Sequence, residues 1–255
     1  MELIDSHCHI DVAEFDDDRA AVLERCRCAG VTRLVVPGVD AARWPGLIAL
    51  CRREAGLYPA LGLHPIYLEQ HGNDAVQWLE QQLAITPEVI AIGEIGLDFF
   101  VAELDRQRQQ ALFEAQLSIA RDANLPVILH IRKAHDQVLA TLRRLRVKGG
   151  IAHAFSGSLD QARHFIELGF KLGFGGTMTY DGANKIQRLA RELPLEAIVL
   201  ETDAQDMSGA AHRGERNSPE YLPEHLQALA QLRGMDAADV AKQTTLNAQQ
   251  ALGLS

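Results

Sequence analysis

The sequence lacks the features of membrane and secreted proteins. Its 255 residues contain no apolar run of about 18 residues, the length that a membrane-spanning helix requires. The first residues, MELID, show neither the basic region nor the apolar stretch of a signal peptide. The four cysteines lie near the amino terminus without the spacing of a disulfide framework: Cys8, Cys26, Cys28 and Cys51. We therefore expect a cytoplasmic protein with free thiols and no membrane association.

The sequence also has no excess of positive charge. It contains 34 acidic and 25 basic residues, which gives a formal net charge of −9 at pH 7. This balance argues against a broad electrostatic surface for duplex nucleic acid. It does not exclude a nucleic-acid substrate, because metal cations in a site can hold a phosphate group against an acidic protein.

No linker or low-complexity tract divides the chain, so we expect one domain over residues 1–255. Short apolar runs typical of strands alternate with helical patterns, several of which end at a glycine such as Gly30, Gly56 or Gly169. The predicted strands lie at residues 3–4, 34–36, 60–63, 89–92, 127–129, 151–152, 171–174 and 198–200. Eight such units at this length are typical of an α/β fold, the closed (β/α)8 TIM barrel. The strand count alone also permits an open doubly wound sheet.

The first predicted strand runs into a pair of histidines. If residues 2–9 form one extended strand, His7 and His9 project to the same side, whereas Cys8 points away from them and packs in the core. Two imidazoles at this spacing form part of a metal site that needs further ligands from elsewhere in the chain.

Four other predicted strands also end at residue types that ligate metals: Glu94, His130, His153 and Asp203. In a TIM barrel the carboxyl ends of all strands surround one mouth, so this pattern favours the barrel over the open sheet. Taken singly, each residue also has a structural interpretation, such as a helix cap or a hydrogen-bonded histidine.

Six candidate ligands exceed the three protein ligands that one catalytic zinc usually takes. We therefore predict two divalent metal ions, with Zn, Mn and Mg as candidates. In this hypothesis Glu94 bridges the ions. One ion is held by His7, His9 and Glu94, and the other by Glu94, His130 and His153.

Glu94 and Asp203 are the predicted catalytic residues, and Asp203 either binds metal or accepts the proton of the attacking water. The predicted substrate-binding residues lie in loops beside the same mouth: His64, Arg132, Arg213 and Arg216. The alternatives are a histidine bonded to a loop carbonyl and solvated surface charges.

Six sequence runs resemble the TatD family of metal-dependent deoxyribonucleases, and most of all its YjjV-like branch. The runs are DSHCH at 5–9, GLHP at 62–65, GEIGLD at 93–98, PVILH at 126–130, HAFSG at 153–157 and ETDA at 201–204. This resemblance implies a TIM-barrel hydrolase of the amidohydrolase superfamily with a divalent-metal centre, often a 3′ to 5′ exonuclease. It also implies that the metal-centre residues are His7, His9, Glu94, His130, His153 and Asp203.

The chain departs from the family pattern at three places. Ile131 stands where the family frequently has a serine after the histidine of the fifth predicted strand. Gln205 stands where the family commonly has proline, which frees a backbone φ that proline would hold. Phe99-Phe100 stands where the family often has a tyrosine, and this removes a hydroxyl that could contact phosphate.

The sequence hypothesis is metal-dependent cleavage of DNA phosphodiester bonds, acting as a 3′ to 5′ exonuclease on single strands or ends. One alternative is a binuclear-metal hydrolase of a small amide, lactone or phosphoester, because a fold does not assign a substrate. An alternative of another class is a metal-dependent binding protein without turnover. We expect a monomer, because the sequence shows neither an extended heptad pattern nor an exposed apolar stripe.

Overall fold

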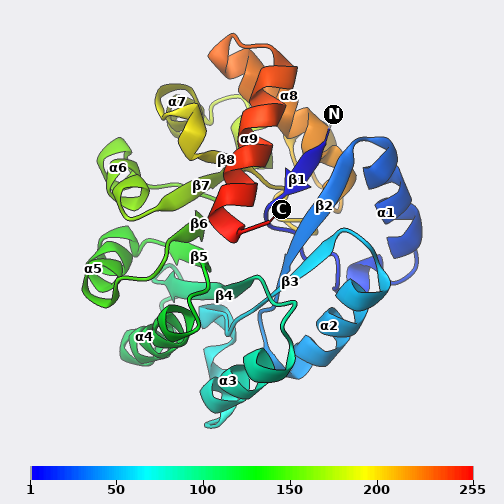
Figure 1. Cartoon of the computed structure of the whole chain (residues 1–255). Coiled ribbons are helices and arrows are strands. Elements are labelled where there is room, and N and C mark those ends of the chain that lie inside the picture. Colours follow the sequence, from blue (N-terminus) through cyan, green and yellow to red (C-terminus); the bar gives the residue numbers. More distant parts are fainter. Residues whose placement is uncertain (1, 255) are drawn as a thin grey trace.

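A computed structural model describes residues 2–254, in which eight parallel strands form a barrel surrounded by helices (Figure 1). The strands follow one another around the barrel in chain order: β1 (Leu3–Asp5), β2 (Val31–Pro37), β3 (Leu57–Leu61), β4 (Ala91–Asp98), β5 (Val127–Arg132), β6 (Gly150–Ala152), β7 (Phe170–Phe174) and β8 (Ile198–Leu200). The backbone N–H of Ser6 donates to the carbonyl of Leu200 (3.1 Å), which joins the first strand to the last. The predicted (β/α)8 barrel is confirmed, and the open sheet is excluded.

The helices alternate with the strands and cover their outer faces (Figure 1). They are α1 (Arg19–Cys28), α2 (Trp44–Arg53), α3 (Ala75–Ile85), α4 (Arg106–Asp122), α5 (His135–Leu145), α6 (Leu159–Glu167), α7 (Asn184–Glu192), α8 (Leu222–Arg233) and α9 (Ala237–Leu252). The predicted glycine stops Gly30, Gly56 and Gly169 all have φ near +85°, a conformation that glycine adopts without a steric cost. No helix within residues 2–254 is long and apolar enough to cross a membrane.

Several predicted strand boundaries were wrong. The strand predicted at 60–63 ends at Leu61, and the one predicted at 127–129 continues to Arg132, so His130 lies within β5. The first strand ends at Asp5 instead of continuing to His9, because the Asp5 carboxylate accepts the backbone N–H of His7 (3.2 Å) and turns the chain there. Strand β4 continues to Asp98, so Glu94 lies within the strand and not after its end. Cys8 is buried in the core, as expected.

The lumen of the barrel is filled at one end. Apolar side chains from seven of the strands form one cluster inside it: Ile4, Val35, Ala60, Ala91, Ile128, Ile151 and Val199. Ala248 and Leu252 of α9 pack on this cluster, and α9 crosses this end of the barrel in Figure 1. The side chain of Asn247 fastens the helix there by donating to the carbonyls of Leu195 and Ile198, both at 2.7 Å. The opposite end, where the strands have their carboxyl termini, is left for polar groups.

Two glutamines of α4 hold the ends of β3 and β4. Buried Gln116 accepts the backbone N–H of Leu63 (2.7 Å) and donates to its carbonyl (3.1 Å). Gln109, two helical turns earlier, makes the same pair of bonds with Asp98, at 2.8 and 2.9 Å. Because His64 follows Leu63 directly, α4 sets the backbone position of residues at the mouth.

We predict that Gln116→Leu lowers the free energy of unfolding by about 2–6 kcal/mol, since it leaves two buried backbone groups unpaired at about 1–3 kcal/mol each. Urea unfolding followed by circular dichroism measures the loss. Gln107→Leu, at an exposed position on the same helix, is the matched control. Equal stability of the two variants would contradict a clamping role for Gln116.

Candidate metal centre

Glu94 lies at the centre of a cluster of histidines. Within the described chain, five imidazole nitrogens lie within 3.5 Å of its carboxylate. Oxygen Oε1 faces His64 Nε2 (3.2 Å), His130 Nδ1 (2.9 Å) and His153 Nε2 (2.9 Å), and Oε2 faces His7 Nε2 (3.2 Å) and His9 Nε2 (3.5 Å). The side chain of Glu94 is almost completely buried. The structure thus brings histidines from four regions of the sequence together around one carboxylate.

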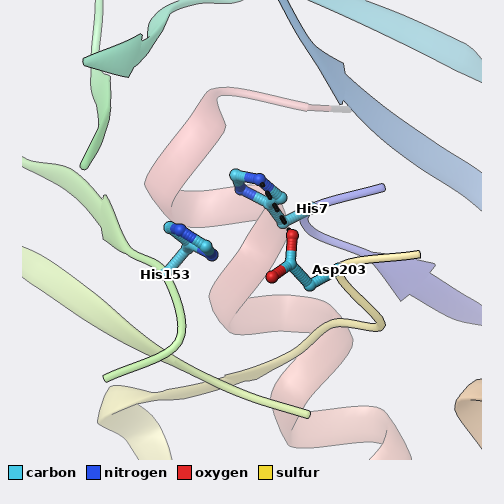
Figure 2. A group of neighbouring side chains, drawn as sticks. All are labelled: His7, His153 and Asp203. Carbon is cyan, nitrogen blue, oxygen red and sulfur yellow. Dashed lines mark ion pairs between the residues drawn. The ribbon is translucent and has the colours of Figure 1, made fainter. Parts of the chain in front are cut away.

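Asp203 completes the cluster from the loop after β8. One carboxylate oxygen lies 3.6 Å from His7 Nε2 and 3.8 Å from His9 Nε2. Figure 2 shows the side chains of His7, His153 and Asp203 turned toward one another. The rings of His7 and His153 are stacked, with their centroids 3.9 Å apart. Asp203 has φ +57°, a left-handed conformation that is uncommon outside glycine and recurs at functional sites.

Strand geometry places Glu94 and His130 side by side. Strands β4 and β5 pair in parallel, and Gly96 lies opposite His130 in the register. A Cβ atom on Gly96 would come within 1.9 Å of the carbonyl oxygen of His130, so only glycine permits this close approach. Asp98, at the end of β4, holds the other side of the imidazole, with Oδ2 3.0 Å from His130 Nε2.

Asp5 links the two loops that carry His7 and Asp203. Its carboxylate accepts the backbone N–H of His7 (3.2 Å) and that of Thr202 (3.0 Å), and also the Thr202 hydroxyl. This group is completely buried, and burial raises its pKa to about 7. A single side chain therefore ties the end of β1 to the end of β8, where the two loops meet.

The charges within the cluster stabilise one another. Burial raises the pKa of Glu94, but the surrounding histidines outweigh it and hold that pKa well below its usual range. Burial likewise opposes charge on His9 and His153, yet the Glu94 carboxylate raises their pKa values to about 9 and about 10. Burial lowers the pKa of His64 to about 4 and that of His7 well below its usual value. Glu94 is therefore an anionic carboxylate surrounded by several imidazoles.

The donor set fits divalent cations. His7 Nε2 and His9 Nε2 lie only 3.2 Å apart. Because at most one proton fits between two such nitrogens, at least one of them presents a lone pair there. Three sets of donor atoms each lie within 4.8 Å of one another: His7, His153 and Asp203; His7, His9 and Glu94; and His64, Glu94 and His130. Imidazole and carboxylate ligands of this kind suit Zn and Mn. The assignment of individual residues as ligands stays a prediction.

His64 is drawn into the cluster by its contact with Glu94. Its Nδ1 accepts the backbone N–H of Ile66 (3.1 Å), so in the neutral ring the proton is on Nε2, which faces Glu94. A protonated ring nitrogen donates a hydrogen bond and does not bind metal. This tautomer agrees with the prediction that His64 binds substrate and not metal.

The three predicted arginines lie in different surroundings. Arg132 ends β5, about half exposed, with its guanidinium 3.7 Å from Asp98 Oδ2. Arg213 is exposed, with its guanidinium 5.9 Å from the ring of Tyr180. Arg216 forms a two-pronged ion pair with Asp18, at 2.7 and 2.8 Å, and contacts none of the six predicted ligands within residues 2–254. The substrate-binding role of Arg216 stays a prediction, and its guanidinium is already paired with Asp18.

Sequence reasoning did not assign a role to Glu201, which lies beside His153. Its Oε1 accepts the backbone N–H of Ala154 (2.5 Å) and lies 3.9 Å from His153 Nδ1. A Cβ atom on Gly173 would come within 2.0 Å of its Oε2, so glycine there leaves room for this carboxyl group. Burial raises the pKa of Glu201 to about 8. The position of Glu201 directly after an apolar strand was the available signal.

The comparison with protein families shows to which family the chain belongs. The model of TatD-related DNases matches residues 4–253, nearly the whole chain. This chain belongs to the TatD family. Within it, the chain is 42% identical over 241 residues to an uncharacterized metal-dependent hydrolase, YjjV, of Escherichia coli K12, covering 94% of this chain and 93% of the relative. The crystal structure of E. coli YjjV, a TatD homologue, superposes with a TM-score of 0.95 at 40% identity, covering 99% of this chain and 98% of that one.

A more distant TatD relative carries a name that specifies an activity. The 3′-5′ ssDNA/RNA exonuclease TatD of Erwinia tasmaniensis is 30% identical over 260 residues, which cover 99% of this chain and 100% of the relative. Family membership and the relatives together make this chain a metal-dependent hydrolase. The sequence-based resemblance to the TatD family is confirmed.

Proposed function

We propose that this chain is a 3′ to 5′ exonuclease that hydrolyses phosphodiester bonds at the ends of single-stranded DNA, with two divalent cations held around Glu94. The observation that carries the proposal is the contact of both Glu94 oxygens with five imidazoles. The TatD family match and the exonuclease name of the Erwinia relative support the choice of substrate.

Two divalent cations would neutralise charge on the phosphoryl oxygens and lower the pKa of a water molecule. His7, His9 and Glu94 would hold one of these cations, and Glu94, His130 and His153 would hold the other. This arrangement fixes the positions of both charges relative to the reacting phosphate.

The remaining polar side chains orient the phosphate and move a proton. Asp203 accepts the proton of the attacking water through the carboxylate that faces His7 and His9. His64 carries its proton on Nε2, which faces Glu94 Oε1 (3.2 Å) in the structure, and in the proposal this N–H turns to a phosphate oxygen when the substrate is bound. Asp98 keeps the imidazole of His130 in one orientation, as partners of metal-bound histidines generally do.

The burial of the centre supports a strand end as the substrate. Glu94 and His153 are 2% and 6% exposed, and α9 blocks the opposite end of the barrel. A phosphodiester must therefore enter from the mouth to reach these groups. A flexible single-stranded terminus can do so, whereas a duplex would first have to separate.

We predict that removal of divalent cations with a chelator abolishes DNA cleavage and that Mg, Mn or Zn restores it. A single strand labelled at its 5′ end should give progressively shorter products, and the same strand labelled at its 3′ end should release a labelled mononucleotide at once. A circular single strand and a blunt duplex serve as controls that should resist cleavage. Full activity in chelator would refute metal dependence, and rapid cutting of the circle would refute an exonuclease.

A further inference from the structure

An exposed phenylalanine lies next to two cations at the mouth of the barrel. Phe100, in the loop after β4, is 54% exposed, although a large apolar side chain is usually covered. The guanidinium carbon of Arg132 lies 4.2 Å from the centroid of its ring, and Lys133 Nζ lies 4.8 Å from it. The two cations follow one another at the end of β5, so the group combines the loops of two adjacent strands.

The backbone holds this group in a defined position relative to the metal centre. Asp98 Oδ1 accepts the backbone N–H groups of Phe100 (2.9 Å) and Val101 (3.2 Å), while Oδ2 of the same carboxylate contacts His130. The backbone N–H of Phe99 donates to the carbonyl of Arg132 (2.8 Å), which joins the two loops. One buried carboxylate thus fixes both an imidazole beside Glu94 and the loop that carries Phe100.

The backbone of Lys133 also departs from ordinary geometry. Lys133 has φ +53°, a left-handed conformation that a residue with a side chain adopts at a cost. Strained residues of this kind persist where the surrounding structure requires them, and they gather at functional sites. In this case the conformation accompanies an ammonium group beside an exposed ring.

We propose that Phe100 is a stacking platform for one base of the single strand, with Arg132 and Lys133 contacting the phosphates on either side of that base. This inference rests on the proposed function and names how the substrate is held. An aromatic face accepts any base, and a cationic surface follows the backbone, which together are the usual means of binding single strands without sequence preference. The platform supplies locally the positive charge that the chain lacks as a whole.

If Phe100 stacks on one base of the strand, the increase in KM caused by Phe100→Ala should depend on whether that base is present. Phe100→Ala should raise KM for a single-stranded oligonucleotide about tenfold, and Phe100→Trp should restore the KM of the unaltered protein. The substrate series carries one abasic residue at successive positions from the 3′ end. At the position that stacks on Phe100, the penalty of Phe100→Ala should vanish, because no base is left to lose its partner.

The control for the substitution itself is Ile85→Ala, which truncates an exposed apolar residue at the end of α3. If Phe100→Ala cleaves every substrate as the unaltered protein does, or if its penalty is the same at every abasic position, the platform is refuted. In either case the unaltered protein still degrades single strands, so the proposed function stands. If the unaltered protein cleaves no DNA, the proposed function itself fails.

The contact of Lys133 with a phosphate can be tested separately, by the salt dependence of binding. With chelator present to prevent cleavage, Lys133→Gln should reduce the slope of log Kd against log salt concentration by about 0.7, the value for one phosphate contact on a single strand. Lys148→Gln is the matched control, because this exposed lysine precedes β6 at the opposite end of the barrel. An unchanged slope for Lys133→Gln would show that the ammonium group does not contact the strand.

Discussion

Replacing Glu94 by glutamine should lower kcat/KM on single-stranded DNA about 1,000-fold. The substitution keeps the shape of the side chain but removes the negative charge that five imidazoles face. Without that charge, neither cation keeps its shared ligand. Metal ions contribute several kcal/mol of transition-state stabilisation, and about 4 kcal/mol corresponds to this loss in rate.

The measurement is the initial rate of mononucleotide release at saturating metal concentration. Glu88→Gln is the matched control, since Glu88 lies just before β4 and pairs with Arg52 at the surface. It should retain full activity. An active Glu94→Gln enzyme, with both variants folded by circular dichroism, would remove the basis of the proposed mechanism.

Replacing Asp203 by asparagine should lower kcat about 100- to 10,000-fold, the range for loss of a positioned proton acceptor. Asparagine keeps the size of the side chain and its left-handed backbone conformation, which Asn tolerates well. Because the cations are assigned mainly to Glu94 and the histidines, the variant should still be stabilised by metal. Its melting temperature should therefore rise on addition of Mn, and that of the unaltered protein should rise to a similar extent.

Two measurements on the same sample test this assignment: single-turnover cleavage and thermal unfolding with and without metal. Asp206→Asn, an exposed change in the same loop, is the control and should behave as the unaltered protein does. If Asp203→Asn loses metal stabilisation along with activity, Asp203 is a ligand and not the proton acceptor. Undiminished kcat would exclude both roles.

The sequence was informative about the fold because strand and helix patterns repeat. Each predicted strand overlaps an observed one. A barrel strand is buried on both faces and is therefore apolar along its whole length, and a short apolar run such as residues 127–129 shows this pattern. Metal-binding residue types at the strand ends predicted a common mouth. The structure does bring His7, His9, Glu94, His130, His153 and Asp203 together.

The contacts that position these groups could not be read from the sequence. Gln109 and Gln116 look like ordinary helix residues, and only the packing of α4 against the barrel shows that they hold the backbone of Asp98 and Leu63. The tautomer of His64 depends on a backbone N–H two residues later. Such roles depend on three-dimensional neighbours and not on residue type or spacing.

The central claim is that Glu94 lies between two divalent cations. Anomalous diffraction from crystals of the Mn-loaded protein tests it most directly. We predict two peaks about 3.5–4 Å apart, each at a bonding distance from one Glu94 carboxylate oxygen. The peak nearer Oε2 should also touch His7 and His9, and the other should touch His130 and His153. A loaded crystal with no anomalous peak beside Glu94 would contradict the account.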